Sequence, residues 1–392
     1  MLRFLDAGES HGRALTAIIE GLPSNFNVNV DYINKELKRR QAGYGRGSRM
    51  KIEEDKIELW SGLRGIKTTG NPITMVIFNK DYENWTDILN NQPDEHNRIT
   101  IPRPGHGDLV GYFKYNTGDI RDVIERTSAR ETAIRTAVGA LCKNILEELN
   151  IFIRSKVNGI GEIYDEPVDL FHEDNYRIIE ESEVRCYNSK IEEKIKREID
   201  ICKENGNTIG GSIFISMKGI PIGIGSYTQW DRKLDALLSF AVMSIQGIKA
   251  LQVGNVLDMS LKGSSFNDEI FYKEGKIVRG SNNSGGIEAG VSNGENIELT
   301  AYMKPIPTIK KSVSSIDLKS KQNVSSRYER SDVCGVVPAS IVIENVCAFE
   351  VLKQILIKFP GDDFNELKEG IDEYRREVYN KWWRNFSWQK KD

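Results

Sequence analysis

The hydrophobic positions of the chain follow two different periods. Runs of strand length that are rich in β-branched and aromatic residues occur at 14–19, 56–60, 73–78, 212–216 and 297–302, and several are bounded by glycine or proline. Each run is therefore predicted to form a β-strand. The strands are dispersed along the chain and do not alternate in a simple way with helices.

A helical period predicts long helices between these strands. The clearest helix begins near Ser128, because Ser128 and Glu131 match the capping box. A stripe then continues at helical spacing and is expected to face the core, at Ile134, Val138, Leu141, Ile145 and Leu149. Further helices are predicted from Asp231 to Gln246, from Pro338 to Phe359, from Phe364 to about Trp383 and, with a charged surface, from Ser189 to Glu204.

These elements predict the α+β class and a single domain over residues 1–392. A Rossmann sheet is not supported, because the strands are dispersed and neither a GxGxxG nor a Walker glycine pattern occurs. No proline- or serine-rich linker divides the chain. The charged helix is expected to form a peripheral insertion at about 180–206, and the end of the chain a tryptophan-rich helical tail at about 362–392.

Composition and charge narrow the partners and the compartment. The 392 residues are 39% hydrophobic and carry a net charge of −3, so we expect a substantial core and no overall attraction for nucleic acid. The five cysteines are odd in number and none has CxxC or Cys/His ligand spacing, which fits a reducing cytoplasm better than a disulfide framework or a zinc site. No basic-then-apolar leader is visible and no apolar run approaches the ~18 residues of a membrane span, so neither export nor membrane insertion is expected.

Two of the four histidines lie in glycine-bracketed segments, Gly8-Glu9-Ser10-His11-Gly12 and Arg103-Pro104-Gly105-His106-Gly107-Asp108. A histidine between glycines has little side-chain cover and can exchange a proton near neutral pH. For either segment alone, a surface turn explains the pattern equally well. Finding the pattern twice, with a dense arginine cluster between the two segments, favours a shared site for an anionic ligand.

That arginine cluster lies at residues 35–51, which carry seven basic side chains against one acid. Its second half, Gly43-Tyr44-Gly45-Arg46-Gly47-Ser48-Arg49, has too many glycines to stay helical. Guanidinium groups bind phosphates and carboxylates in a bidentate way, so this loop suits an anionic ligand. A solvated basic face or an RNA-binding patch explains the segment equally well.

Two further segments offer groups for an anion or a cofactor. Glu125-Arg126-Thr127-Ser128 places a guanidinium and two hydroxyls at a predicted helix start, where backbone amides form a natural phosphate seat. The stretch 282–290 supplies glycine-rich backbone donors, and the two prolines in Lys304-Pro305-Ile306-Pro307-Thr308 provide a rigid frame for a planar or phosphorylated cofactor. Taken one at a time, the last two segments are also explained as turns between strands.

In their order along the chain, these segments closely resemble the chorismate synthase family. The residues that carry the resemblance are Gly8 to Gly12, Arg39 to Met50, Thr69 to Ile73, Arg103 to His106, Glu125 to Ala133, Gly285 to Gly294, Lys304 to Thr308 and Arg330 to Asp332.

The resemblance implies a lyase that requires reduced FMN. It would convert 5-enolpyruvylshikimate 3-phosphate to chorismate by 1,4-elimination of phosphate and the C6 hydrogen, the last common step of aromatic amino acid biosynthesis. The family also implies a β-α-β sandwich, with long helices packed between antiparallel sheets, and a homotetramer. NADPH is a candidate reductant, and because no extra reductase domain is visible we expect an external flavin reductase to supply the reduced flavin.

The resemblance also implies roles for individual residues. His11 would protonate or neutralise the departing phosphate, His106 would protonate the reduced flavin ring, and Asp332 would accept or relay a proton near flavin N5. The substrate-binding residues would be His11, Arg40, Arg46, Arg49, Ser128, Arg130 and Arg330. The cofactor-binding residues would be Arg40, Arg46, Arg126, Thr127, Ser128, Gln246, Gly247, Ala289, Lys304, Pro305, Ile306, Pro307, Thr308 and Arg330, with Arg40 and Arg46 also assigned to a reduced nicotinamide nucleotide.

The chain departs from the usual family pattern at four places. Gly107 stands where alanine usually follows the histidine, Thr127 replaces a serine, Ala289 replaces a glycine, and Val336-Val337-Pro338 carries one additional residue. The alanine matters if that position needs a positive φ or a close approach to the flavin. The additional residue could shift Asp332 relative to the helix that follows.

Two other classes of function remain open from the residues alone. Glu9, His11, His106 and Asp108 could form the metal site of a phosphohydrolase, since carboxylate plus imidazole is ordinary ligation for a divalent ion. Residues 35–51 could serve a non-catalytic RNA-binding module, which would show a steep salt dependence of RNA affinity and no flavin binding.

Overall fold

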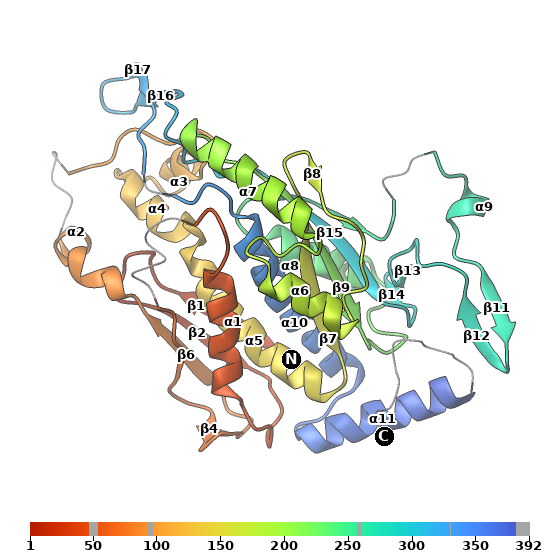
Figure 1. Cartoon of the computed structure of the whole chain (residues 1–392). Coiled ribbons are helices and arrows are strands. Elements are labelled where there is room, and N and C mark those ends of the chain that lie inside the picture. The colour runs from red at the N-terminus through yellow and green to blue at the C-terminus, as the bar shows by residue number, and fades with distance from the viewer. Residues whose placement is uncertain (47–53, 92–96, 257–259, 330, 382–392) are drawn as a thin grey trace.

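The computed structural model describes residues 1–46, 54–91, 97–256, 260–329 and 331–381. Its framework consists of two antiparallel sheets with helices between them, which confirms the α+β class (Figure 1). The first sheet has the strand order β1 (Arg3–Ala7), β2 (Ala14–Glu20), β6 (Ile73–Phe78) and β3 (Glu58–Leu59). The second has the order β10 (Ile248–Val253), β15 (Ile297–Met303), β9 (Gly211–Lys218), β7 (Phe152–Ile160) and β8 (Ile163–Tyr164).

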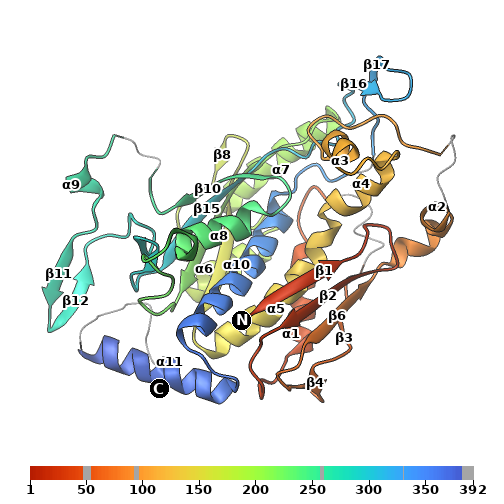
Figure 2. The same ribbon diagram turned by 180° about the vertical axis from the view of Figure 1, so that it is seen from behind.

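Two long helices fill the space between the sheets. Helix α5 (Thr132–Glu148) packs on β2 and β6, helix α10 (Val336–Lys358) packs on β7 and β9, and the two helices pack on each other. Seen from behind, the two sheets again lie on opposite sides of this helix pair (Figure 2). Most residues of both helices are buried, and α10 is apolar almost all round, as expected for a helix covered on every side.

The remaining elements surround this sandwich or extend from it. Helix α1 (Val30–Gln41) packs on both α5 and α10. The other helical segments are η2 (Lys80–Asn84), α2 (Thr86–Asn90), α3 (Asp108–Tyr115), α4 (Ile120–Thr127), η3 (Ala129–Glu131), α6 (Glu173–Glu181), α7 (Ser189–Glu204), η4 (Trp230–Arg232), α8 (Leu234–Met243), α9 (Gly263–Phe266) and α11 (Phe364–Lys381). Five short pairs of antiparallel strands, each with two or four paired positions, complete the secondary structure of the described residues. They are β4 (Leu63–Arg64) with β5 (Lys67–Thr68), β11 (Ile270–Lys273) with β12 (Lys276–Arg279), β13 (Ile287–Glu288) with β14 (Val291–Ser292), β16 (Ser314–Asp317) with β17 (Gln322–Ser325), and β8 with the end of β7.

The predicted elements appear with small changes of boundary. Strand β6 and helix α7 have the predicted bounds, and β2, β9 and β15 extend their predicted runs by one to three residues. The predicted strand at 56–60 is reduced to β3, which pairs with β6 at only two positions. The predicted end of the last helix, at Trp383, lies outside the described residues.

The helix predicted from Ser128 begins differently. Residues Ala129–Glu131 form a 3₁₀ turn before α5, and the Ser128 hydroxyl accepts from the amide of Arg130. The Glu131 carboxylate does not complete a capping box but accepts from Gln246 Nε2 at 2.7 Å. The capping-box prediction was therefore wrong in its second half, because a tertiary contact takes the glutamate.

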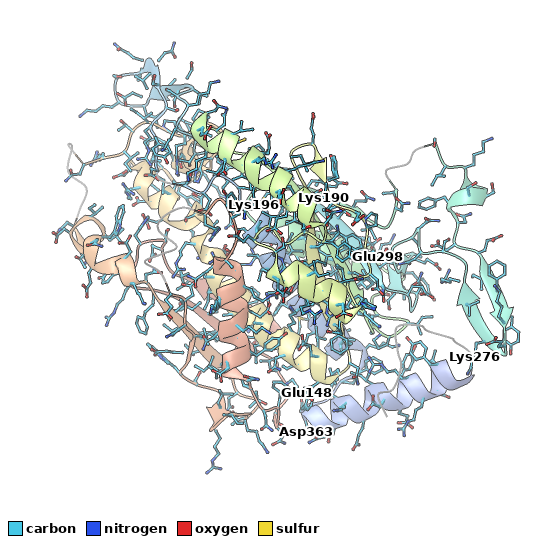
Figure 3. The ribbon with its side chains drawn as sticks, viewed as in Figure 1. Glu148, Lys190, Lys196, Lys276, Glu298 and Asp363 are labelled. Atoms are coloured by element: carbon cyan, nitrogen blue, oxygen red, sulfur yellow. The ribbon has the colours of Figure 1, made fainter. Side chains whose placement is uncertain are left out.

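Helix α7, predicted as a peripheral insertion, also supports the loop that follows α1. Its Ile199 is fully buried and would contact a Cβ at Gly45, while Asp200 accepts from the Tyr44 hydroxyl at 2.8 Å. Lys196, which Figure 3 labels beside α7, lies with Nζ 4.8 Å from the centre of the Tyr44 ring. At the far end of the molecule, Lys276 donates to the carbonyl of Tyr379 at 3.0 Å and so fastens the β11–β12 hairpin to α11 (Figure 3).

A network of buried charges lies where α1, α5 and α10 meet. Glu344 of α10 is completely buried and accepts from Lys143 of α5 at 2.6 Å and from Arg39 of α1 at 2.9 Å. Arg39 also binds Glu36 of its own helix, and Arg185 adds a further contact to Glu344 at 3.1 Å. Each buried charge therefore has an opposite partner, which is the condition for burying it at all.

Helices α5 and α10 approach each other closely at Gly139. A Cβ placed at this glycine would lie 2.1 Å from the carbonyl oxygen of Asn345. Because the obstructing atom belongs to the backbone, a larger residue would have to push the two helices apart.

We expect Gly139→Ala to lower the free energy of unfolding by about 1–3 kcal/mol, the usual cost of overpacking a core. Gly370 offers a matched control in α11, since nothing lies within 4 Å of a Cβ there and alanine should be neutral or slightly stabilising. Urea denaturation of the two variants measures both effects. Equal stability of Gly139→Ala and wild type would show that the helices can separate at no cost.

Candidate functional site

A cavity of about 900 Å³ lies where α5 and α10 begin, beside the turn between β1 and β2. Its wall is made by segments that are far apart in the sequence and includes most of the residues predicted from the sequence. Those residues are His11, Arg40, Arg46, His106, Arg126, Thr127, Ser128, Arg130, Gln246, Gly247, Lys304, Pro305, Ile306, Pro307, Thr308 and Asp332.

Three predicted site residues are not in this wall. Arg49 and Arg330 lie outside the described residues. Ala289 is exposed in the turn between β13 and β14, away from the residues that line the cavity. Its φ is +50°, so alanine here adopts a left-handed conformation that glycine would adopt at no steric cost.

His11 is held by Glu125, a residue of α4 that the sequence analysis did not assign to the site. Nδ1 of His11 lies 2.9 Å from Glu125 Oε1, and the His11 amide donates to Oε2 at 2.8 Å. Burial opposes ionisation of Glu125, but the hydrogen bonds from the His11 ring and amide outweigh it, so the pKa of Glu125 is below its ordinary value. A carboxylate at Nδ1 fixes the ring orientation and favours the tautomer that carries its proton on Nδ1.

His106 has the same kind of partner. Its Nδ1 lies 2.6 Å from Oδ1 of Asp108, which is completely buried at the start of α3. Asp108 also accepts from the amide and from Nε of Arg103, at 2.9 and 2.8 Å. Burial again opposes the charge, but the bonds from His106 and Arg103 hold the pKa of Asp108 well below its usual range.

Two buried arginines of the wall, Arg40 and Arg130, share one carboxylate. Asp55 lies with Oδ1 2.6 Å from Arg130 Nη1 and with Oδ2 3.4 Å from Arg40 Nη1. Arg130 also donates twice to Asn79 Oδ1, and Arg40 donates twice to Thr132 Oγ1. Burial lowers the pKa of Arg40 to about 10, against the attraction of Asp55, so the Arg40 guanidinium remains charged at neutral pH.

Arg46 and Asp332, predicted for different roles, contact each other. Arg46 Nη1 donates to Asp332 Oδ2 at 2.5 Å, and both side chains remain partly exposed to the cavity. Asp332 lies between β17 and α10, whose first turn contains Pro338. A proline is tolerated there because the first amides of a helix have no intrahelical partner.

The residues 304–308 form a rigid part of the wall. The amide of Lys304 donates to Gly247 O at 3.0 Å, its Nζ donates to Gly105 O at 2.6 Å, and the Thr308 hydroxyl accepts from Arg103 at 3.2 Å. These bonds tie the proline segment to the loop that carries His106.

One buried acceptor in the wall lacks a donor. Gln246 gives its amide hydrogen to Glu131, but its Oε1 is buried without a hydrogen-bond partner in the described parts of the chain. An unsatisfied buried acceptor costs free energy that a ligand N–H would recover. Together with the apolar side chains of Ile245, Met303 and Ile306 in the same wall, it suits a planar heterocycle that carries an N–H donor.

The phosphate seat predicted at 125–128 differs from its expected form. Residues 120–127 form α4, so Arg126 and Thr127 end one helix instead of beginning another. The Thr127 hydroxyl donates to Val123 O at 2.7 Å within that helix, and the amide of Ser128 donates to Ile124 O. The anion-binding groups that remain at this place are side chains, chiefly the guanidinium of Arg126.

Sequence reasoning missed several residues of the wall and its support. Arg103 stood within the motif that was noted for His106, so its proximity was a usable signal, and Asp108 was considered only as a metal ligand and not as the partner of His106. Glu329 carried a weak signal, because the segment it begins resembles the one that begins at Glu125. Asp55, Trp85 and Arg121 carried none, because their neighbours in space are remote in the sequence.

The metal-site hypothesis gains no support from the geometry. Within the described ranges, no group of three or more histidine, cysteine, aspartate or glutamate side chains is placed to hold a metal ion.

None of the helices in those ranges is both long and apolar enough to cross a membrane.

Comparison with known proteins identifies close relatives. Residues 2–356 match the family model described as chorismate synthase. The chorismate synthase of Clostridium tetani is 62% identical over 97% of this chain and 98% of its own length, and that of Alkaliphilus oremlandii is 50% identical over 95% and 98%. A crystal structure of chorismate synthase has a TM-score of 0.78 to this chain at 37% identity, covering 97% of this chain and 98% of that one.

The low pKa of Asp108 gives a pH-dependent prediction. Because the folded-state pKa is depressed, the charged carboxylate stabilises the fold above the unfolded pKa of about 3.9, and this contribution is lost as the pH falls through the folded value. We expect Asp108→Asn to lower the free energy of unfolding by about 1–3 kcal/mol at pH 7. The deficit should shrink as the pH is lowered below about 4. Urea unfolding of both proteins across this range checks it, and a deficit that stays constant with pH would contradict it.

Proposed function

Because the chain belongs to the chorismate synthase family, we propose that the cavity at the start of α5 and α10 is where it carries out the reaction of that family. That reaction is a carbon–oxygen elimination, in which 5-enolpyruvylshikimate 3-phosphate loses phosphate and its C6 hydrogen to give chorismate. The observation that carries the proposal is that two histidines, each bonded to a buried carboxylate, line the same cavity as two buried arginines.

The charge of the cavity suits the substrate, which bears a phosphate and two carboxylates. We assign these groups to Arg40, Arg46 and Arg130, supported by the fixed orientation that Asp55 and Asp332 give to the guanidinium groups. His11, Ser128, Arg49 and Arg330 complete the proposed substrate set, and of these the two arginines lie outside the described residues.

The family requires a reduced flavin, which we propose to be FMN. When bound, a reduced flavin supplies an electron transiently as the carbon–oxygen bond breaks. The unsatisfied Oε1 of Gln246 and the apolar wall suit its ring, and Lys304 and Arg126 offer charge for its phosphate. The full set that would hold it is Arg40, Arg46, Arg126, Thr127, Ser128, Gln246, Gly247, Ala289, Lys304 to Thr308 and Arg330.

Proton movements are assigned to three side chains of the cavity. His11 would give a proton from its ring to an oxygen of the departing phosphate, with Glu125 stabilising the ring while it is charged. His106 would hold a proton beside the flavin ring with the support of Asp108. Asp332 would accept a proton once substrate draws Arg46 away from it.

We propose the family's homotetramer for this chain, and the place of Ala289 is compatible with a neighbouring copy. Ala289 is exposed and outside the wall of this chain's own cavity, so its contact with a flavin would have to reach the cavity of a neighbouring copy. We further propose NADPH as the source of reducing equivalents, delivered through an external flavin reductase.

A cytoplasmic location fits the five free thiols, four of which are buried.

An anaerobic assay with chemically reduced FMN and 5-enolpyruvylshikimate 3-phosphate tests the reaction. Chorismate and phosphate should appear in equal amounts, and neither should appear with oxidised FMN. Phosphate without chorismate would indicate a phosphohydrolase.

In the same assay we expect His11→Ala and His106→Ala each to lower kcat by about 10²–10⁴, the usual share of a general acid or base. His172→Ala is the control, because His172 is exposed just before α6.

Asp55→Asn tests the arginine pair. Loss of the shared negative charge should leave Arg40 and Arg130 less precisely oriented and raise KM for 5-enolpyruvylshikimate 3-phosphate by roughly tenfold, which corresponds to 1.4 kcal/mol of binding. Asp174→Asn is a matched control, since Asp174 pairs with Arg177 at 2.9 Å on the exposed face of α6. Unchanged KM in Asp55→Asn would remove the arginine pair from the proposed substrate site.

A further inference from the structure

Arg121 occupies a central place in the cavity wall that neither its sequence context nor the proposed function explains. It lies on α4, lines the cavity, and has a side chain that is 19% exposed. Its Nη1 is 3.8 Å from Glu125 Oε1 and 3.9 Å from Glu329 Oε1. Glu125 and Glu329 come from opposite halves of the chain, and each begins a similar segment, Glu-Arg-Thr-Ser in one case and Glu-Arg-Ser-Asp in the other.

Glu125 connects Arg121 to His11. Glu125 Oε1 is the atom that lies 2.9 Å from His11 Nδ1. A second path to the same histidine runs through Trp85, whose indole stacks on the His11 ring with a centroid separation of 3.9 Å and an angle of 28°. The guanidinium carbon of Arg121 lies 5.1 Å from the centre of that indole, within the range of a cation–π interaction.

Glu329 connects Arg121 to His106 through two further residues. Glu329 Oε2 accepts from Arg103 Nη1 at 3.0 Å, and Arg103 Nη2 donates to Asp108 Oδ1 at 3.0 Å. Asp108 Oδ1 is in turn 2.6 Å from His106 Nδ1. Positive and negative groups therefore alternate without interruption from one histidine to the other, and Arg121 stands in the middle.

The distances show how Arg121 acts. At 3.8 and 3.9 Å its contacts with the two carboxylates are longer than hydrogen bonds, so they act as charge attraction more than as directional bonds. Glu125 is almost fully buried and Glu329 is partly buried, so solvent screens the attraction only in part. Removing the positive charge would weaken the attraction that draws the two carboxylates towards each other. Glu125 would keep its bonds from His11, and Glu329 would keep its bonds from Arg103 and Arg327, so we expect a small displacement of each.

We propose that Arg121 is a positioning residue that fixes the positions of His11 and His106 relative to each other across the cavity. This inference rests on the proposed function, because it concerns the proton-transfer roles of His11 and His106. Arg121 acts through Glu125 and Trp85 on one side and through Glu329 and Arg103 on the other. It is not assigned to the substrate or to the flavin.

Steady-state kinetics of Arg121→Gln tests the proposal with reduced FMN and 5-enolpyruvylshikimate 3-phosphate. Glutamine keeps the polar side chain but removes the charge, so we expect kcat to fall roughly ten- to hundredfold, the scale of a small misplacement of catalytic groups. KM for the substrate should change by less than about threefold. Arg121→Lys retains the charge without the planar group and should recover part of kcat.

The chain provides a matched control in Arg197→Gln. Arg197 pairs with Glu193 one helical turn away at 3.8 Å, the same distance and spacing as Arg121 with Glu125, but on the exposed surface of α7. This variant should match wild type in kcat and KM. A loss of kcat in Arg121→Gln that Arg197→Gln does not show is therefore due to the place of the charge.

Tryptophan emission provides a second readout that needs neither flavin nor substrate. Trp85 stacks on the His11 ring and also lies within cation–π range of Arg121, so its emission should change in Arg121→Gln. The same substitution made in a Trp85→Phe background should leave the emission of the other five tryptophans unchanged. An emission change that persists without Trp85 would indicate a general structural change and overturn the proposal.

The outcomes separate this inference from the proposed function. A rise in KM with kcat unchanged would make Arg121 a substrate-binding residue, and wild-type values for both would deny it a role; either result overturns the proposal while leaving the lyase assignment intact. If His11→Ala and His106→Ala were as active as wild type, the proton-transfer roles would fail first, and the proposal about Arg121 would fail with them.

Discussion

The buried charge of Glu344 is the constraint on which the arrangement of the helices depends. A carboxylate completely enclosed in α10 requires cations beside it, and Lys143 of α5 and Arg39 of α1 supply them. Removing one member of such a group leaves an uncompensated charge, which costs about 3–5 kcal/mol. The relative positions of α1, α5 and α10 are therefore fixed by matching charges as well as by packing, and the residue after Arg39 is Arg40, which reaches the cavity. The core thus aligns a guanidinium group of the site.

The same arrangement, a buried charge paired with an opposite charge, recurs at the cavity with fewer residues. His11 and His106 each pair through Nδ1 with a carboxylate that is nearly or fully buried, and Arg40 and Arg130 share the buried Asp55. In each case the group that would meet a ligand is oriented by an opposite charge behind it. The orientation exists before any ligand binds, so little reorganisation is needed during the reaction.

Local signals in the sequence were sufficient for part of this structure. The apolar run of β6 and the charged amphipathic pattern of α7 gave the correct bounds, and the glycine-bracketed histidines did come together in one cavity. Strand β7 was missed because Arg154 and Lys156 interrupt its apolar pattern. Lys156 can be buried there because its Nζ donates to Asp165 at 2.6 Å and to the carbonyl of Glu166 at 2.7 Å. Helix α4 was missed because Glu125 to Ser128 was interpreted as the start of the next helix. Partners such as Asp55 and Glu329 depend on contacts between remote segments, which a single sequence does not contain.

The contact between Gly139 and the backbone of Asn345 also limits how the cavity can close around a ligand. The two helices already meet at their backbones there, and both begin at the cavity. The base of the cavity therefore cannot narrow by a closer approach of α5 and α10. Any tightening around bound substrate and flavin must come from the other segments of the wall. The helix contact thus sets a lower limit on the width of the base, and the ligands must fit that width.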